Sequence, residues 1–168
     1  GNQGMDALGE EYVLPHLLNS PGNFTASKLG WVKQNEPEVY AKVHKFMLPG
    51  DYLAARMTGE VVTTPSGLSE GIFWDFVNQR PADFLFDHFG FSQNILPEVL
   101  PTFAEQGKVT AAAAAELGLR TGIPVTYRAG DQPNNAFSLN VLEPGEVAAT
   151  AGTSGVVYGV SDQIKFDP

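Results

Sequence analysis

Residues 123–135 read IPVTYRAGDQPNN, and residues 146–159 read EVAATAGTSGVVYG. The first run is apolar and β-branched up to residue 129, and glycine and proline bound it, which predicts a short buried strand over 123–129. This strand would deliver the carboxylate of Asp131 to its C-terminal end. Pro133 suits the first turn of a following helix, because that position needs no N–H donor. Ligands of open α/β sheets bind at the carboxyl ends of strands, so Asp131 stands where a general base would be placed.

The second run predicts a hairpin whose turn is Gly152-Thr153-Ser154-Gly155. The free backbone N–H groups and the two hydroxyls of this turn are the ingredients of a phosphate cradle. A base and a phosphate cradle roughly twenty residues apart favour phosphoryl transfer. Taken alone, a Gly-Asp pair and a Gly-Thr-Ser-Gly turn are each more often plain turns. The chain has neither a Walker loop nor a dinucleotide fingerprint here, because the required lysine and glycine spacing are absent.

Composition and charge exclude several classes of protein. The chain has 168 residues, of which 43% are hydrophobic, and these values are typical of one globular domain. The formal net charge of −9 disfavours a nucleic-acid partner, because phosphate backbones bind basic surfaces. The chain has no cysteine, which excludes disulfides and thiolate metal sites, and no apolar run has the length of a membrane span. With no signal peptide at its start, we expect a cytoplasmic protein.

Hydrophobic spacing and capping residues predict most of the helices. Thr25 and Thr110 are expected to cap helices through their hydroxyls, and Gly118 is expected to end the second of these. The predicted helices are one within residues 1–23, one from 25, one over 37–47, one from 51 to 59, one over 82–89 and one over 111–117.

Two strands, over 61–64 and 71–76, are predicted to pair antiparallel, with Ser66 and Ser69 in the turn between them. Asp51 is a candidate second catalytic carboxylate, but a helix cap accounts for its place after a Pro-Gly break and is the preferred interpretation. A type II turn is predicted at Pro144-Gly145, and a domain boundary is placed there.

Four stretches together resemble one family of proteins. They read FTASKLGWV at 24–32 with NEP at 35–37, LPGDYL at 48–53 closing on MTGE at 57–60, SGLSEG at 66–71 running on to Asp75, and GDQ at 130–132 with GTSG at 152–155. No single stretch is specific, but their combination and spacing resemble the FGGY carbohydrate kinases. Within that family the chain is most similar to the xylulokinase branch.

The resemblance implies an α/β fold that is part of a ribonuclease H-like, actin- and hexokinase-like kinase with two domains. Residues 1–143 would form the later part of domain I, on the sugar-binding side. Residues 144–168 would form the first hairpin of domain II, on the ATP-binding side. The family's N-terminal phosphate loop, its metal-binding carboxylate and most of its adenine-binding domain have no counterpart in these 168 residues. The chain is therefore expected to be an internal piece that does not phosphorylate sugar by itself.

The resemblance also implies the chemistry. Asp131 would be the general base, and Asp131, Gln132 and Asn23 would contact the sugar. Gly152, Thr153, Ser154 and Gly155 would contact the phosphates of ATP. Mg²⁺ is expected, with protein ligands that the sequence does not identify.

D-xylulose is the first choice of substrate, and ribulose, gluconate and glycerol are the alternatives. A different class of function also stays open. The chain could be a non-catalytic α/β interaction module, in which an uncovered domain face would favour a homodimer.

Overall fold

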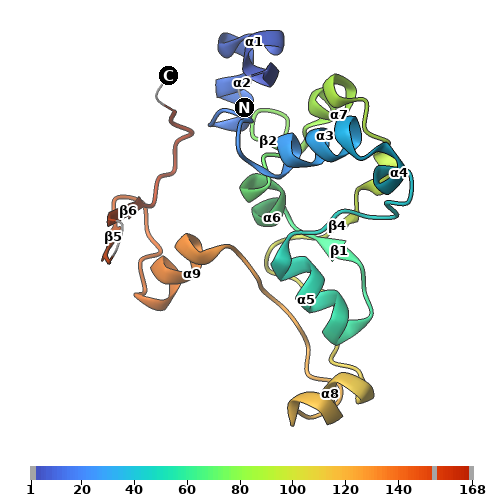
Figure 1. Ribbon diagram of the computed structural model, residues 1–168. Coiled ribbons are helices and arrows are strands. Elements are labelled where there is room, and N and C mark those ends of the chain that lie inside the picture. The colour runs from blue at the N-terminus through green and yellow to red at the C-terminus, as the bar shows by residue number, and fades with distance from the viewer. Residues whose placement is uncertain (1–2, 153–154, 167–168) are drawn as a thin grey trace.

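The computed structural model of the chain describes residues 3–152 and 155–166. Figure 1 shows a helical body at the N-terminal side and an extended connection that leads from it to a last helix and a hairpin. The helices are α1 (Gln3–Leu8), α2 (Glu10–Leu17), α3 (Thr25–Asn35), α4 (Pro37–Tyr40), α5 (Pro49–Thr58), α6 (Pro65–Glu70), α7 (Asp83–Phe89), the 3-10 helix η1 (Gln93–Ile95), α8 (Ala111–Leu117) and α9 (Asp131–Ser138). The strands are β1 (Val62–Thr63), β2 (Trp74–Asp75), β3 (Arg80–Pro81), β4 (Glu98–Val99), β5 (Val147–Ala151) and β6 (Gly155–Gly159).

The main core is built around aromatic rings. Leu68 of α6 and Phe86 of α7 are fully buried in it together with Phe73. The Phe73 ring lies 4.5 Å from that of Phe46 and 5.5 Å from that of Phe86, measured between ring centroids. Burying a side chain of this size contributes roughly 1.5–3 kcal/mol. Because Leu68 is anchored in this core, the end of α6, which carries Glu70, has a fixed place.

The predicted antiparallel pair over 61–64 and 71–76 is wrong. In the described residues β1 pairs in parallel with β4, and β2 pairs antiparallel with β3. Helix α6 lies between β1 and β2, so Ser66 and Ser69 are helical residues and not turn residues. The reason is local, because Thr64 caps the helix by accepting a hydrogen bond from Gly67 N at 3.1 Å, and Pro65 occupies the first helical position.

The helix predictions are confirmed in part. Thr110 caps α8, its hydroxyl oxygen accepting from Ala113 N at 3.2 Å, and Gly118 ends the helix with a φ of 67°. Residues 3–17 form two helices and not one, because Gly9, with a φ of 85°, interrupts them. Helix α4 stops at Tyr40, short of the predicted end at residue 47. Thr25 is the first residue of α3 and does not cap it through its side chain.

Residues 123–129 form an extended segment, and the prediction of a buried strand ending at Asp131 is wrong. The segment hydrogen-bonds on one edge only, where Gln106 N donates to the Val125 carbonyl oxygen at 2.7 Å and Val125 N donates to Gly107 O at 2.9 Å. Its residues are exposed or half-buried. A strand becomes buried when neighbouring strands and helices cover it, and in the described part of the chain none lies on the other edge.

The C-terminal part confirms the pairing of the predicted hairpin strands and the predicted turn at Pro144-Gly145. Strands β5 and β6 pair antiparallel up to Ala151 opposite Gly155, so the predicted hairpin is present. Thr153 and Ser154, at the centre of the predicted phosphate turn, lie outside the described residues. At the predicted type II turn, Glu146 N donates to Glu143 O at 3.0 Å and Gly145 has a φ of 93°.

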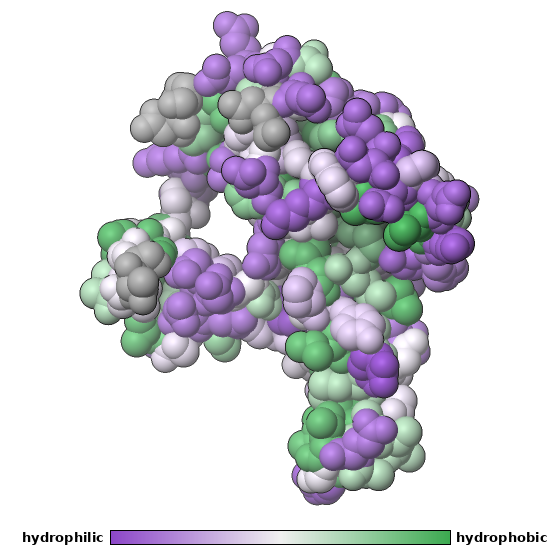
Figure 2. Space-filling model, in the orientation of Figure 1, coloured by the Kyte–Doolittle hydropathy of each residue, from purple (hydrophilic) through white to green (hydrophobic). Residues whose placement is uncertain are grey.

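The surface exposes several large apolar side chains. Figure 2 shows green, hydrophobic surface around α5 and α8 and on the β5–β6 hairpin, while hydrophilic surface covers the N-terminal body. Leu53 is 62% exposed, Phe103 71% and Val157 77%. Apolar faces of this kind are typical of surfaces that another polypeptide covers. Over the described residues, no helix combines the length and the apolar character needed to cross a membrane.

Candidate active site

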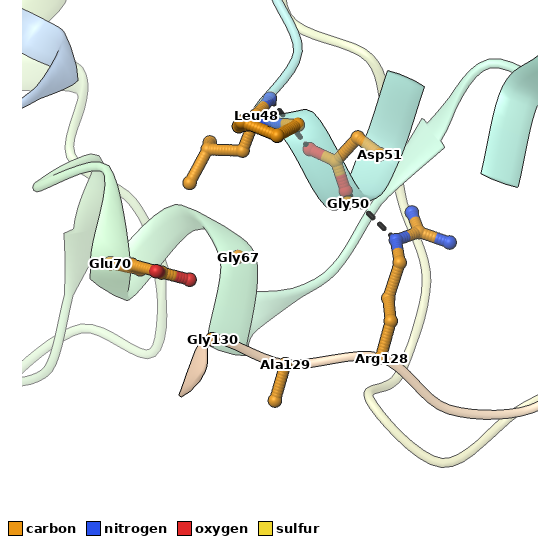
Figure 3. Close-up of a pocket in the computed structure, with 9 residues that line it drawn as sticks. Leu48, Gly50, Asp51, Gly67, Glu70, Arg128, Ala129 and Gly130 are labelled. Carbon is orange, nitrogen blue, oxygen red and sulfur yellow. Dashed lines mark hydrogen bonds and ion pairs between the residues drawn. The ribbon is translucent and has the colours of Figure 1, made fainter. Parts of the chain in front are cut away.

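A pocket of about 220 Å³ lies where the start of α5, helix α6 and the extended segment before α9 meet. Three segments far apart in the sequence supply its wall, which Figure 3 shows in close-up. It is lined by Leu48, Pro49, Gly50, Asp51, Gly67, Glu70, Arg128, Ala129 and Gly130.

Asp51 is a buried carboxylate with three hydrogen-bond donors. It is the third residue of α5, which begins at Pro49, so Asp51 lies inside the helix and not at the cap position before it. Its Oδ2 accepts from the backbone N of Leu48 at 3.3 Å, so the helix-cap interpretation is confirmed only in that Asp51 bonds an N–H group at the helix start. The same oxygen accepts from Thr63 Oγ1 at 3.0 Å, and Oδ1 accepts from Arg128 Nε at 2.9 Å. Only 4% of the Asp51 side chain is exposed. These contacts tie the buried Asp51 to three other parts of the chain, which favours a structural role for it over that of a second base.

Arg128 joins three parts of the chain. Besides Asp51, its guanidinium donates through Nη2 to the carbonyl oxygen of Val62 at 2.5 Å, and through Nη1 to Oε1 of Gln106. The arginine side chain is 12% exposed, and Gln106 is 1% exposed. A charged group at such a depth is stable when it is paired and hydrogen-bonded, as this one is. Figure 3 shows Asp51 between the backbone of Leu48 and this guanidinium.

A second pocket, of about 240 Å³, adjoins the first and holds the predicted base at its rim. Glu70 and Gly130 line both pockets. A Cβ atom on Gly130 would lie 2.6 Å from the carboxyl atoms of Glu70, so the absence of a side chain at Gly130 lets this carboxyl lie against the backbone. Burial raises the pKa of Glu70, and the negative charges of Asp131 and Asp51 raise it further.

Asp131 begins α9 and lies at the wall of the second pocket. Both of its carboxylate oxygens accept hydrogen bonds from Gln132, Oδ1 from the backbone N at 2.9 Å and Oδ2 from the side-chain Nε2 at 3.3 Å. Gln132 and Pro133 line the same pocket. The structure therefore brings together Asp131 and Gln132 of the predicted sugar site.

The other predicted site residues lie elsewhere. Asn23 is exposed in the turn before α3, with a φ of 65°, and does not line either pocket. Gly152 and Gly155 flank the hairpin turn, and open space surrounds the Cβ position of each. Among the described residues, no group of three or more His, Asp or Glu side chains could hold a metal ion. The structure therefore identifies no closed metal centre in this part of the chain.

Sequence reasoning missed Glu70 and Arg128. One signal was available for Arg128, which is a charged residue inside an otherwise apolar run. Such a residue is buried only if a partner neutralises it. For Glu70 no comparable signal exists, because a glutamate in a short polar stretch is usually solvated.

Known proteins match this chain over nearly its whole length. A model of the N-terminal domain of the FGGY family of carbohydrate kinases matches residues 15–138. Xylulose kinase of Escherichia coli (strain K12) is 31% identical over 156 residues, which are 93% of this chain and 32% of that protein. Autoinducer-2 kinase of Enterobacter sp. (strain 638) is 32% identical over 84% of this chain and 27% of its own length. The chain thus spans about a third of the length of such relatives.

The solved structures agree with this match. Xylulose kinase from Rhodospirillum rubrum superposes with a TM-score of 0.90 at 29% identity, over 98% of this chain and 34% of that one. Glycerol kinase of Plasmodium falciparum, at 20% identity and a TM-score of 0.79, shares the fold over 89% of this chain and 30% of its own. The α/β fold of a ribonuclease H-like, actin- and hexokinase-like kinase is thereby confirmed. The chain belongs to the FGGY family of carbohydrate kinases.

Proposed function

We propose that this chain forms part of an enzyme that phosphorylates a sugar hydroxyl with ATP, and that the sugar is D-xylulose. The relatives that support this substrate include the xylulose kinases of Escherichia coli and Lactococcus lactis. Ribulose, gluconate and glycerol are the alternatives, and the structural relatives include a gluconate kinase from Lactobacillus acidophilus and a glycerol kinase.

The general base in this proposal is Asp131. The observation that carries it is the place of the carboxylate, at the first residue of α9 and on the wall of a pocket. A sugar hydroxyl that enters the pocket would give its proton to Asp131 as its oxygen attacks the γ-phosphorus atom, and ADP would leave with the electron pair of the broken P–O bond. Gln132 orients the carboxylate through its two hydrogen bonds.

ATP would supply the phosphoryl group from the side of the β5–β6 hairpin. We propose that residues 152–155 contact its phosphates and that residues 144–168 belong to the second domain of the kinase. Mg²⁺ would balance phosphate charge when bound. No residue of this chain is assigned to it, because the described residues contain no cluster of three or more metal-ligating side chains that would single out its ligands. The contact between Asn23 and the sugar stays a prediction.

The test is a coupled ADP-release assay on the full-length protein with Mg·ATP and, in separate arms, D-xylulose, D-ribulose, D-gluconate and glycerol. Asp131→Asn is expected to lower kcat by about 10²-fold or more, the usual contribution of a general base, with ATP affinity by calorimetry unchanged. Asp87→Asn is the matched control, because Asp87 is an exposed aspartate on α7. An Asp131→Asn enzyme with a near wild-type rate would reject the base, and the absence of Mg·ATP binding heat would favour a non-catalytic module.

A further inference from the structure

Beyond Val125, the segment that leads to Asp131 is attached to the rest of the protein by side chains and not by its backbone; the Tyr127 ring, for example, stacks on that of Phe103 at 4.9 Å between centroids. Its last backbone hydrogen bonds to a neighbouring segment are those of Val125. In the part of the chain that the structure describes, no backbone hydrogen bond joins residues 126–129 to another element. Asn134 Nδ2 donates to Ala129 O at 2.8 Å, but this contact comes from α9 and moves with it.

Arg128 makes the hydrogen-bonded attachment that the backbone lacks. Its guanidinium reaches Asp51 on α5, the carbonyl of Val62 on β1 and the buried amide of Gln106. Two of these partners belong to elements 66 and 77 residues away in the sequence. The contacts form a buried clamp, defined here as Arg128 with Asp51, Gln106 and the Val62 carbonyl.

The clamp is not an anion-binding site. Each of the three guanidinium nitrogens already donates to a protein atom, and the negative charge of Asp51 neutralises the arginine. A phosphate would have to displace Asp51, whose side chain is 4% exposed. The remaining role is mechanical, because Arg128 lies three residues before Asp131 and fixes the point from which α9 starts.

We propose that Arg128 is a positioning residue that holds Asp131 in place at the pocket wall through this buried clamp. The inference rests on the proposed role of Asp131 as general base. Its physical basis is that a catalytic group displaced by about 1 Å can cost about 10²-fold in rate. Arg128 does not touch substrate in this proposal and acts only through the position of Asp131.

The central experiment compares Arg128→Met with Arg120→Met in the full-length protein. Arg120 is exposed beyond the end of α8, so the control removes the same charge without touching the clamp. We expect Arg128→Met to lower kcat for sugar phosphorylation about 10- to 10²-fold, with the KM for Mg·ATP unchanged. Hydrogen exchange by mass spectrometry should become faster at residues 134–137, whose N–H groups are the first that the start of α9 protects, and stay unchanged at the core of α6 and α7.

A second variant covers the case in which Arg128→Met fails to fold because it leaves Asp51 buried and unpaired. Asp51→Asn/Arg128→Met removes both charges, so the clamp is lost without an uncompensated charge. This double variant should show the same drop in kcat and the same local gain in exchange. Arg128→Lys should not rescue the rate, because an ammonium group cannot bridge the three partners that a planar guanidinium reaches.

Two outcomes would overturn the proposal. One is a double variant with wild-type kcat. The other is exchange at residues 134–137 that is no faster than in wild type in both variants that carry Arg128→Met. A failure of the proposed function would give a different result. Asp131→Asn would then keep its activity, and the exchange experiment would still show whether Arg128 fixes the segment.

Discussion

Replacing Asp51 with Asn should destabilise the protein far more than breaking an ion pair on its surface. The substitution keeps the shape of the side chain and removes its charge, so Arg128 stays buried at 12% exposure without a counter-ion. The amide NH₂ group of the asparagine would also face donors that the carboxylate accepts from, Thr63 Oγ1 among them.

The size of the effect follows from the depth of the pair. Two opposite charges about 4 Å apart attract by roughly 4 kcal/mol at an effective dielectric constant of about 20. Removing one partner of a buried pair costs about 3–5 kcal/mol, because the other charge is left uncompensated. The matched control is Glu105→Gln, which breaks the exposed pair with Lys108, where the two side chains are 54% and 59% exposed. Exposed pairs contribute about 0.2–1 kcal/mol.

The assay is urea unfolding followed by tryptophan fluorescence, in a background that carries Trp31→Phe because Trp31 is 58% exposed; Trp74, at 9% exposed, then reports on the core. The midpoint should fall strongly for Asp51→Asn and hardly at all for Glu105→Gln, with unchanged m-values. Equal shifts for the two variants would refute the reasoning, because they would mean that water screens the Asp51–Arg128 pair as it screens the surface pair.

Two predictions concern acid and base titration. Burial would raise the pKa of Asp75, but hydrogen bonds from Asn78 and His16 outweigh it and hold the pKa below its usual range. The stability that Asp75 contributes is thus present above about pH 4 and is lost as the pH falls further. Asn78→Ala should make the urea midpoint fall less steeply between pH 5 and pH 3 than it does in wild type. The same slope of midpoint against pH in both proteins would contradict this prediction. The pKa of Glu70 is raised, so its ionisation costs stability as the pH rises above the usual glutamate pKa of about 4. Glu70→Gln should gain stability over wild type across that range, and a difference that does not change with pH would contradict this.

The candidate site was only partly predictable. Asp131 and Gln132 could be named from the sequence, because a strand signal, a Gly-Asp pair and a following proline mark the start of a helix within a few residues. Glu70 could not be named, because α6 places it at the pocket and the sequence did not predict α6. The residues on both sides of this helix predicted a pair of strands with a turn between them. The role of Asp131 as base and the contacts of Asn23 stay predictions.

The amino-acid sequence by itself determined the features that depend on near neighbours. The Thr110 cap, the Gly118 end of α8 and the turn at Gly145 each rest on hydrogen bonds or backbone angles within a few residues. The four stretches that resemble the FGGY family likewise needed no structure to be recognised.

Only the tertiary structure decided which distant segments meet. Val62 pairs with Glu98, and Arg128 donates a hydrogen bond to Asp51, which lies 77 residues earlier in the sequence. Both contacts depend on how the helices pack around the aromatic core. The residues next to a strand or an arginine in the sequence do not specify which distant segment it will contact. The extended segment 123–129 shows the same limit, since its pattern fits a buried strand and its burial depends on neighbours that the pattern does not specify.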